Sequence, residues 1–343
     1  MVGVGLTMEG EEGNEIMYDL LLDQAWDKQP INTGNYFRSW VDSRYHGASS
    51  LPNELYYAWN LMRKTVYNNT NLNAAQATTK SIIELAPNTT GLLNRTGHHP
   101  TTITYNPTVL TEAWEHFYNA AVREPTLWDN EAYTFDLTDI TRQVLANAFN
   151  PLYIEFVKAA NSSLDGTYSP AKASKIGEQM TSLLLDLDAV LTANGNAQFS
   201  LPAWIAAARA WASPTDVTNK SSTNSSSTTS IASFYEYNAR NQVTLWGPMG
   251  EISDYASKQW GGLIRSYYVP RWQLFINYTL SNSTKVDGEN AALESKLLTF
   301  EEDWQGQTWG EALGESYTAP RQGELQRTIA KVVQAWPDVF EHS

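Results

Sequence analysis

The chain has 343 residues, of which 42% are hydrophobic, and a formal net charge of −14. That composition suffices for a large core, while the acidic balance favours solubility and argues against nucleic acid or an anionic membrane as a partner. There is no cysteine, which excludes disulfides, thiolate zinc sites and cysteine nucleophiles. No apolar stretch reaches the roughly 18 residues of a membrane span, so we expect no membrane partner.

The first thirty residues predict a strand, a turn and a helix. Val2, Val4 and Leu6 alternate with small residues, and a polar turn follows over 9–13. Apolar positions between residues 16 and 25 then share one helix face. The start lacks the length and the positive charge of a secretory leader, so we expect an internal fragment or a truncated gene product.

The rest of the chain shows apolar residues at helical spacing. This pattern predicts a mainly α fold, with helices over 36–41, 55–67, from 109, 137–156 with a kink at Pro151, 176–190, 202–211, 234–245, a long tract from 252, 286–303 and 321–336.

Two polar stretches, 68–106 and 213–230, are predicted to be glycosylated surface loops. Acceptor motifs for N-glycosylation begin at eight positions in the chain: Asn68, Asn88, Asn94, Asn161, Asn219, Asn224, Asn277 and Asn282. Any one of them could arise by chance. Together they indicate passage through a eukaryotic secretory pathway, and hence a secreted or a lysosomal or vacuolar protein.

Metal and cofactor chemistry lacks its usual signatures. The five histidines, His46, His98, His99, His116 and His342, have no ligand spacing, and neither a phosphate-binding glycine loop nor a G-x-S-x-G motif occurs. We therefore expect no metal and no cofactor. Carboxylates and the 13 tryptophans remain as candidates. Tryptophan stacks on sugar rings, although most tryptophans in any protein belong to its core.

Glu9 is the carboxylate in the most informative position. It follows the predicted strand and precedes the predicted helix, which is where barrel enzymes build their active sites. Spacing alone favours a plain acidic turn, in which Glu9, Glu11 and Glu12 are solvated or cap the next helix.

Five segments resemble α-N-acetylglucosaminidases, a family of glycoside hydrolases. They are 3–20 (GVGLTMEGEEGNEIMYDL), 59–68 (WNLMRKTVYN), 135–143 (FDLTDITRQ), 237–256 (YNARNQVTLWGPMGEISDYA) and 267–272 (YYVPRW). The resemblance covers nearly the whole chain, and it is weak after Lys285 and near Ser221. Met8 stands where relatives carry proline, beside the carboxylate that matches the family nucleophile.

The resemblance implies a remnant of a (β/α)8 barrel over 1–30 and an all-helical C-terminal domain over 31–343. It implies a retaining glycosidase that removes terminal, non-reducing α-linked N-acetylglucosamine, as at the ends of heparan sulfate fragments or other glycoconjugates. Glu9 would be the nucleophile, and Trp246, Ile252 and Tyr255 would form one wall of the sugar pocket.

The resemblance also implies what this chain needs from elsewhere. The general acid would belong to an earlier barrel strand, so we expect the chain alone to be inactive and the missing barrel portion to be its partner, together with the carbohydrate. The sequence leaves a homo-oligomer open. Two alternatives remain, namely a non-catalytic helical module that binds carbohydrate through Trp246 and Tyr255, and a helical scaffold without a ligand.

Overall fold

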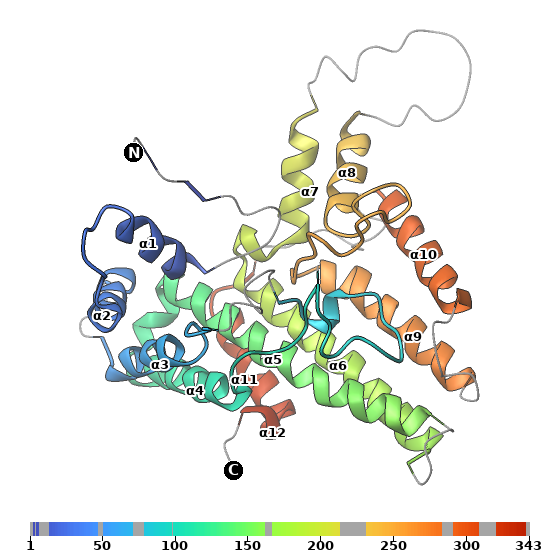
Figure 1. The fold of residues 1–343 in the computed structure, drawn as a ribbon, viewed down its shortest axis with the longest axis horizontal. Helices are drawn as coiled ribbons and strands as arrows, with labels where there is room; N and C mark the ends of the chain where they lie inside the picture. The colour runs from blue at the N-terminus through green and yellow to red at the C-terminus, as the bar shows by residue number, and fades with distance from the viewer. Residues whose placement is uncertain are drawn as a thin grey trace. The chain divides into compact units, whose positions relative to one another are not determined.

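The computed structural model describes residues 3, 5–6, 14–46, 51–70, 79–97, 99–161, 167–212, 231–282, 291–308 and 320–340. Within these ranges the named elements are all helices, which confirms the mainly α prediction (Figure 1). Val2, Val4 and Glu9 lie outside the described residues, so the N-terminal strand and its carboxylate stay predictions. None of the described helices is both long enough and apolar enough to cross a membrane.

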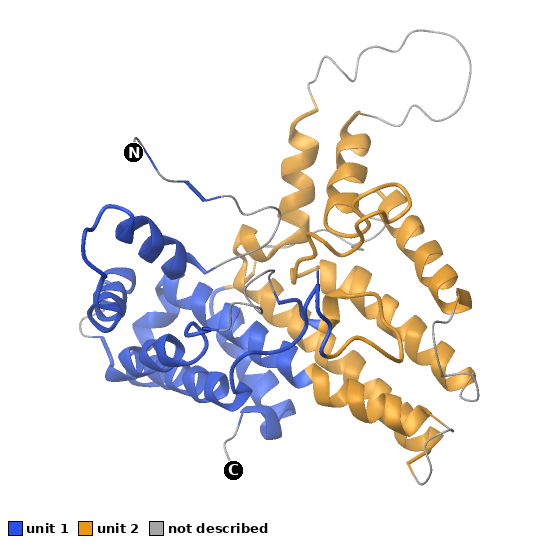
Figure 2. Ribbon diagram, viewed as in Figure 1, with its two compact units in different colours: residues 1–81, 94–148, 322–343 blue, residues 82–93, 149–321 orange. Residues whose placement is uncertain are grey.

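The chain forms two compact units, which are coloured separately in Figure 2. Unit 1 comprises residues 1–81, 94–148 and 322–343. Its helices are α1 (Glu15–Gln24), α2 (Thr33–Arg44), α3 (Asn53–Lys64), α4 (Pro107–Arg123), η3 (Pro125–Asp129), the first part of α5 (Glu131–Ala160), α11 (Glu324–Ala335) and α12 (Pro337–Phe340).

Unit 2 comprises residues 82–93 and 149–321. Its elements are η2 (Ile82–Glu84), the rest of α5, α6 (Pro170–Asn194), η4 (Ala197–Phe199), α7 (Leu201–Ala210), α8 (Ile231–Gln242), the π-helix η5 (Ile264–Tyr268), α9 (Val269–Ser281) and α10 (Ala291–Gly306). The predicted helix near 137–156 is thus part of α5, which continues through Pro151.

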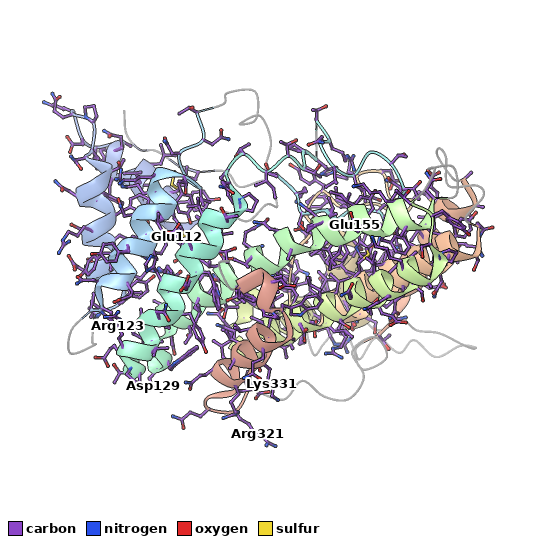
Figure 3. All side chains as sticks on the ribbon, turned by 90° about the horizontal axis from the view of Figure 1, so that it is seen from below. Glu112, Arg123, Asp129, Glu155, Arg321 and Lys331 are labelled. Carbon is purple, nitrogen blue, oxygen red and sulfur yellow. The ribbon has the colours of Figure 1, made fainter. Side chains whose placement is uncertain are left out.

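Aromatic side chains fill the core of unit 1. The buried Trp59 ring meets the rings of Phe37 and Phe117 edge-on, with centroids 6.2 and 5.8 Å away. Its indole N–H donates to the Tyr45 hydroxyl at 2.8 Å, which in turn donates to the carboxylate of Asp136 at 2.6 Å. Figure 3 draws the side chains as sticks and labels the exposed charged residues Glu112 and Lys331. The apolar helix faces predicted over 36–41 and 55–67 therefore belong to the core of unit 1.

Asp136 makes the stability of unit 1 depend on pH. Burial raises the pKa of this carboxyl to about 6, although hydrogen bonds and charge from Arg44 and a hydrogen bond from Tyr45 oppose the rise. The folded chain therefore holds a proton that the unfolded chain, with an aspartate pKa of 3.8, has already released. The stabilisation that this bound proton gives to the folded chain is complete below about pH 4 and is lost as the pH rises through 6.

We expect this loss to be on the order of 2 kcal/mol between pH 4 and 7. Urea unfolding gives the free energy of unfolding of the native chain and of the Asp136→Asn variant, whose amide does not titrate. The value for the native chain minus that for the variant is expected to fall as the pH rises. A difference that stays constant or grows over this range would contradict the assignment.

The core of unit 2 centres on Trp272 of α9. Its ring lies 4.8 Å from that of Phe149 and 5.5 Å from that of Phe275, measured between centroids. Helices α6 and α9 approach closely at Gly177, where an added Cβ would lie 2.7 Å from a methyl carbon of Ile276. The glycine is therefore required by packing, because a larger residue would force the two helices apart.

Two predictions about unit 2 need correction. The surface loop predicted over 68–106 does not hold for Ile82, Ile83 and Leu85, which are at most 1% exposed. The helical tract predicted from 252 begins only at residue 263, since 251–256 forms turns. Asp254, with φ 63°, interrupts a helix there because its backbone is left-handed.

Candidate functional site

Three of the predicted site residues lie together in unit 2. The rings of Trp246 and Tyr255 meet edge-to-face, with centroids 5.4 Å apart and an interplanar angle of 87°. Both side chains are half-buried, and Ile252, in the turn between them, is 46% exposed. The predicted nucleophile, Glu9, lies outside the described residues, so its distance to this aromatic pair is not defined.

A single asparagine at the end of α8 fixes the turn that carries Trp246. The Asn241 carbonyl accepts a hydrogen bond from Trp246 N at 2.7 Å. Its side-chain amide donates to the Gly247 carbonyl at 2.8 Å and accepts from Gly247 N at 2.9 Å, and the same amide donates to Gln305 at 2.7 Å. These bonds hold Trp246 at φ 42°, a left-handed conformation that costs a bulky residue energy unless its surroundings enforce it.

Gly247 has φ 139°, a backbone conformation that residues with a side chain rarely adopt, and the Glu251 side chain occupies the space beside it. A Cβ on Gly247 would lie 2.0 Å from a carboxylate oxygen of Glu251. That oxygen accepts a hydrogen bond from Met249 N at 3.1 Å, which closes the turn on itself. Contacts within the turn itself therefore fix the position of Ile252.

A buried ion network lies beneath the turn. Arg271 pairs with Asp254 through two bonds of 2.9 and 3.0 Å, and its Nε lies 2.6 Å from Glu301. The Arg271 side chain is fully buried, and the two carboxylates are 6% exposed. Asp254 also accepts from Ala86 N at 3.0 Å. Burial is the main cause that raises the pKa of Glu301, against the opposing charge of Arg271.

The same region holds the buried segment Ile82–Glu84. The carboxylate of Glu84 accepts hydrogen bonds from Ser257 at 2.7 Å and from Gln259 at 2.6 Å. The indole N–H of Trp272 donates to the Ile83 carbonyl at 3.0 Å. The segment Ile82–Glu84 is therefore held by hydrogen bonds to residues that follow Tyr255 in the chain. The polar sequence around it gave no sign of these contacts, so it was predicted to be part of a surface loop.

This arrangement is suited to binding rather than to acid–base chemistry. The carboxylates of Asp254 and Glu251 are both engaged in holding the turn. What the turn exposes is an aromatic pair and the aliphatic side chain of Ile252, a surface that can stack on the apolar face of a sugar ring. Among the described residues, no group of three or more histidine, aspartate and glutamate side chains could hold a metal ion.

Sequence reasoning missed the residues that support the site. Asn241, Asp254 and Arg271 all lie in the segments on which the family resemblance was recognised, but nothing in their spacing marks them as partners. Glu301, from α10, lies outside those segments. Arg271 is the only charged residue in α9, and because a buried arginine needs counterions, this position was the signal that sequence reasoning could have used.

The predicted glycosylation acceptors differ in exposure. Three are exposed and three are half-buried, while Asn219 and Asn224 lie outside the described residues. The exposed acceptors are Asn68, Asn94 and Asn277, and the half-buried ones are Asn88, Asn161 and Asn282.

The fold has solved counterparts. It is similar to the family 89 glycoside hydrolase of Clostridium perfringens bound to its substrate GlcNAc-alpha-1,4-galactose, with a TM-score of 0.73 and 24% identity over 95% of this chain and 34% of that chain. The same bacterial enzyme in complex with PUGNAc gives a TM-score of 0.72 at 24% identity, over 94% and 33% of the two chains. The fold is therefore one found in a glycoside hydrolase.

Sequence comparison identifies the family. Residues 36–334 match the alpha-N-acetylglucosaminidase (NAGLU) C-terminal domain, and residues 1–28 match the TIM-barrel domain of the same family. The human alpha-N-acetylglucosaminidase is 34% identical over 279 residues, which are 80% of this chain and 33% of the relative. The chain belongs to the alpha-N-acetylglucosaminidase family, and it spans about a third of the length of this human relative.

Proposed function

We propose that this chain supplies the C-terminal part of a retaining glycoside hydrolase that removes terminal α-linked N-acetylglucosamine. Glu9 contributes the nucleophile, and Trp246, Ile252 and Tyr255 contribute one wall of the sugar pocket. Membership of the family supports the reaction, and a bacterial relative of the same fold is bound to a substrate with an α-linked GlcNAc. The observation that carries the proposal is the edge-to-face aromatic pair on a turn pinned by Asn241.

The chemistry requires two carboxyl groups. The Glu9 carboxylate attacks the anomeric carbon and forms a glycosyl ester while the second carboxyl group protonates the leaving oxygen. The second group then takes a proton from water, which attacks the anomeric carbon and releases Glu9. We assign that general acid to the barrel of the complete enzyme. Trp246 and Tyr255 would hold the sugar so that its anomeric carbon faces the nucleophile.

Substitution of Trp246 tests the sugar wall. In a protein that joins this chain to a complete TIM-barrel domain, Trp246→Ala is expected to lower kcat/KM for an aryl α-N-acetylglucosaminide roughly 10- to 100-fold, because a stacking surface is lost. Trp211→Ala is the matched control, since that indole is 79% exposed at the end of α7. Equal rates for the two variants would remove Trp246 from the pocket.

We also propose that the acceptor asparagines carry glycans and that the protein enters a secretory compartment, either for export or for the lysosome or vacuole. The exposure of Asn68, Asn94 and Asn277 is compatible with attachment of a glycan.

The alternative function is a non-catalytic helical module that binds carbohydrate or serves as a scaffold. The half-buried aromatic pair would serve such a module equally well. Saturable binding of N-acetylglucosamine to this chain alone, abolished by Trp246→Ala, together with an unimpaired Glu9→Gln enzyme, would favour this alternative.

A further inference from the structure

A second candidate site lies in unit 1, between α2 and α3. Here the chain forms a groove of about 220 Å³ whose floor includes the buried rings of Phe37 and Trp59 and whose walls include Tyr56 and Tyr57. This volume is below the roughly 300–1,000 Å³ of pockets for drug-sized ligands, so it suits a ligand of one ring. The two helices lie next to each other in Figure 1.

Two arginines make this groove unusual in a chain of net charge −14. The Arg38 guanidinium carbon lies 4.7 Å from the centre of the Tyr56 ring, and neither Arg38 nor Arg63 has a carboxylate partner among the described residues. The carboxylate of Asp42 accepts a hydrogen bond from the Tyr56 hydroxyl.

Arg63 is held in place with part of its hydrogen-bonding capacity unused. It donates to the side chains of Thr33 at 3.2 Å and Asn60 at 2.9 Å. Its Nε is buried without a hydrogen-bond partner. An arginine offers five N–H donors in a planar fork that matches a carboxylate or a sulfate group. A ligand in the groove would meet the two terminal nitrogens, for each of which one hydrogen bond is described, rather than the buried Nε. This guanidinium is therefore preorganised.

We propose that this groove binds one acidic sugar unit, either a uronic acid or a sulfated sugar. The arginines would bind the anionic group, and the exposed face of Tyr57, which is 57% exposed, would stack on the ring. The acidic surface repels long polyanions but does not oppose a local pairing, because charges farther away than about 8–10 Å are largely screened at physiological ionic strength. The groove shares no residue with the proposed N-acetylglucosamine pocket.

Ligand-observed saturation-transfer NMR on this chain tests the proposal. The Trp246→Ala variant serves as the background, so that the other pocket cannot contribute and failure of the proposed function would leave the result unaffected. The probes are glucuronic acid, N-acetylglucosamine 6-sulfate, neutral glucose, inorganic sulfate and acetate. We expect saturable binding of at least one acidic sugar and none of glucose, and the two acidic probes distinguish a carboxylate ligand from a sulfate ester.

Two variants locate the binding. Arg38→Gln removes an exposed charge and is expected to weaken binding roughly tenfold. Gly34→Leu is expected to abolish it by filling the groove, since a Cβ there would lie 3.9 Å from the Arg63 guanidinium carbon. Both positions are exposed in α2. A Cβ at position 34 would also lie 3.3 Å from Oδ1 of Asn32, which caps α2, so circular dichroism of Gly34→Leu checks that the helix is retained. Lys64→Gln, which removes an exposed charge at the end of α3, should leave binding unchanged.

Three results would overturn the proposal. The first is the absence of saturable binding by either acidic sugar. The second is binding that Arg38→Gln and Gly34→Leu leave intact, or that Lys64→Gln weakens to the same degree. The third is equally tight binding of inorganic sulfate or acetate, because the aromatic walls would then contribute nothing to recognition of the ring.

Discussion

Glu9→Gln, in a protein that joins this chain to a complete TIM-barrel domain, is expected to lower kcat by at least roughly 10⁴-fold, the scale associated with loss of a covalent nucleophile. The amide has nearly the same shape as the carboxylate, so substrate binding should change far less than turnover. It cannot, however, form the glycosyl ester that a retaining enzyme requires. Steady-state kinetics with an aryl α-N-acetylglucosaminide measure both parameters.

The neighbouring acidic residues provide matched controls. Glu11→Gln and Glu12→Gln each remove the same charge within three positions of Glu9, and both should keep turnover within a fewfold of the parent protein. Undiminished turnover in Glu9→Gln, or an equal loss in all three variants, would contradict the role of Glu9.

The present chain assayed alone is a second control. We expect no measurable turnover from it, because a general acid contributes about 10²–10⁴-fold and the barrel would supply it. Turnover by the chain alone that depends on Glu9 would move the general acid into this polypeptide.

Arg271→Ala is expected to cause the largest loss of stability, about 3–5 kcal/mol. The substitution leaves Asp254 and Glu301 buried without their common counterion, and it opens a cavity in the core of unit 2. Urea unfolding followed by circular dichroism measures the loss as a lower midpoint. Because Asp254 anchors the turn after Trp246, the same variant is expected to lose sugar binding before it unfolds.

An exposed ion pair sets the scale for that result. Lys172 and Glu155 are 57% and 46% exposed and pair at 2.8 Å, so Lys172→Ala should leave the urea midpoint nearly unchanged. If Arg271→Ala shifted the midpoint no more than Lys172→Ala does, the buried network would not be what holds the turn.

Much of the helical fold could be predicted because apolar periodicity is a local signal. The apolar stripe predicted over 176–190 lies within α6, and its members are buried as expected: Ile176, Met180, Leu183, Leu187 and Val190. The segment Ile82–Glu84 could not be placed in this way. Its contacts come from residues such as Trp272, which is 189 positions from Ile83, and no local pattern records such a contact.

The candidate site was also predictable only in part. Trp246, Ile252 and Tyr255 were found through resemblance, and the structure brings the two rings together. The asparagine and the ion network that position them were missed, because the partner of a buried charge is set by tertiary packing rather than by spacing. The tract after Ile252 was wrongly predicted as helix. Asp254, which has a left-handed backbone and pairs with Arg271, interrupts it there, and no local apolar pattern marks either feature.

Trapping the glycosyl-enzyme tests the role of Glu9 most directly. A 5-fluoro N-acetyl-α-glucosaminyl fluoride should react with the barrel-joined protein so that the carboxylate displaces fluoride from the anomeric carbon, and the ring fluorine should slow hydrolysis of the ester. Tandem mass spectrometry of the tryptic peptide ending at Lys28 is predicted to place the sugar on Glu9. A sugar found on any other carboxylate, or inactivation without an adduct in this peptide, would contradict the account.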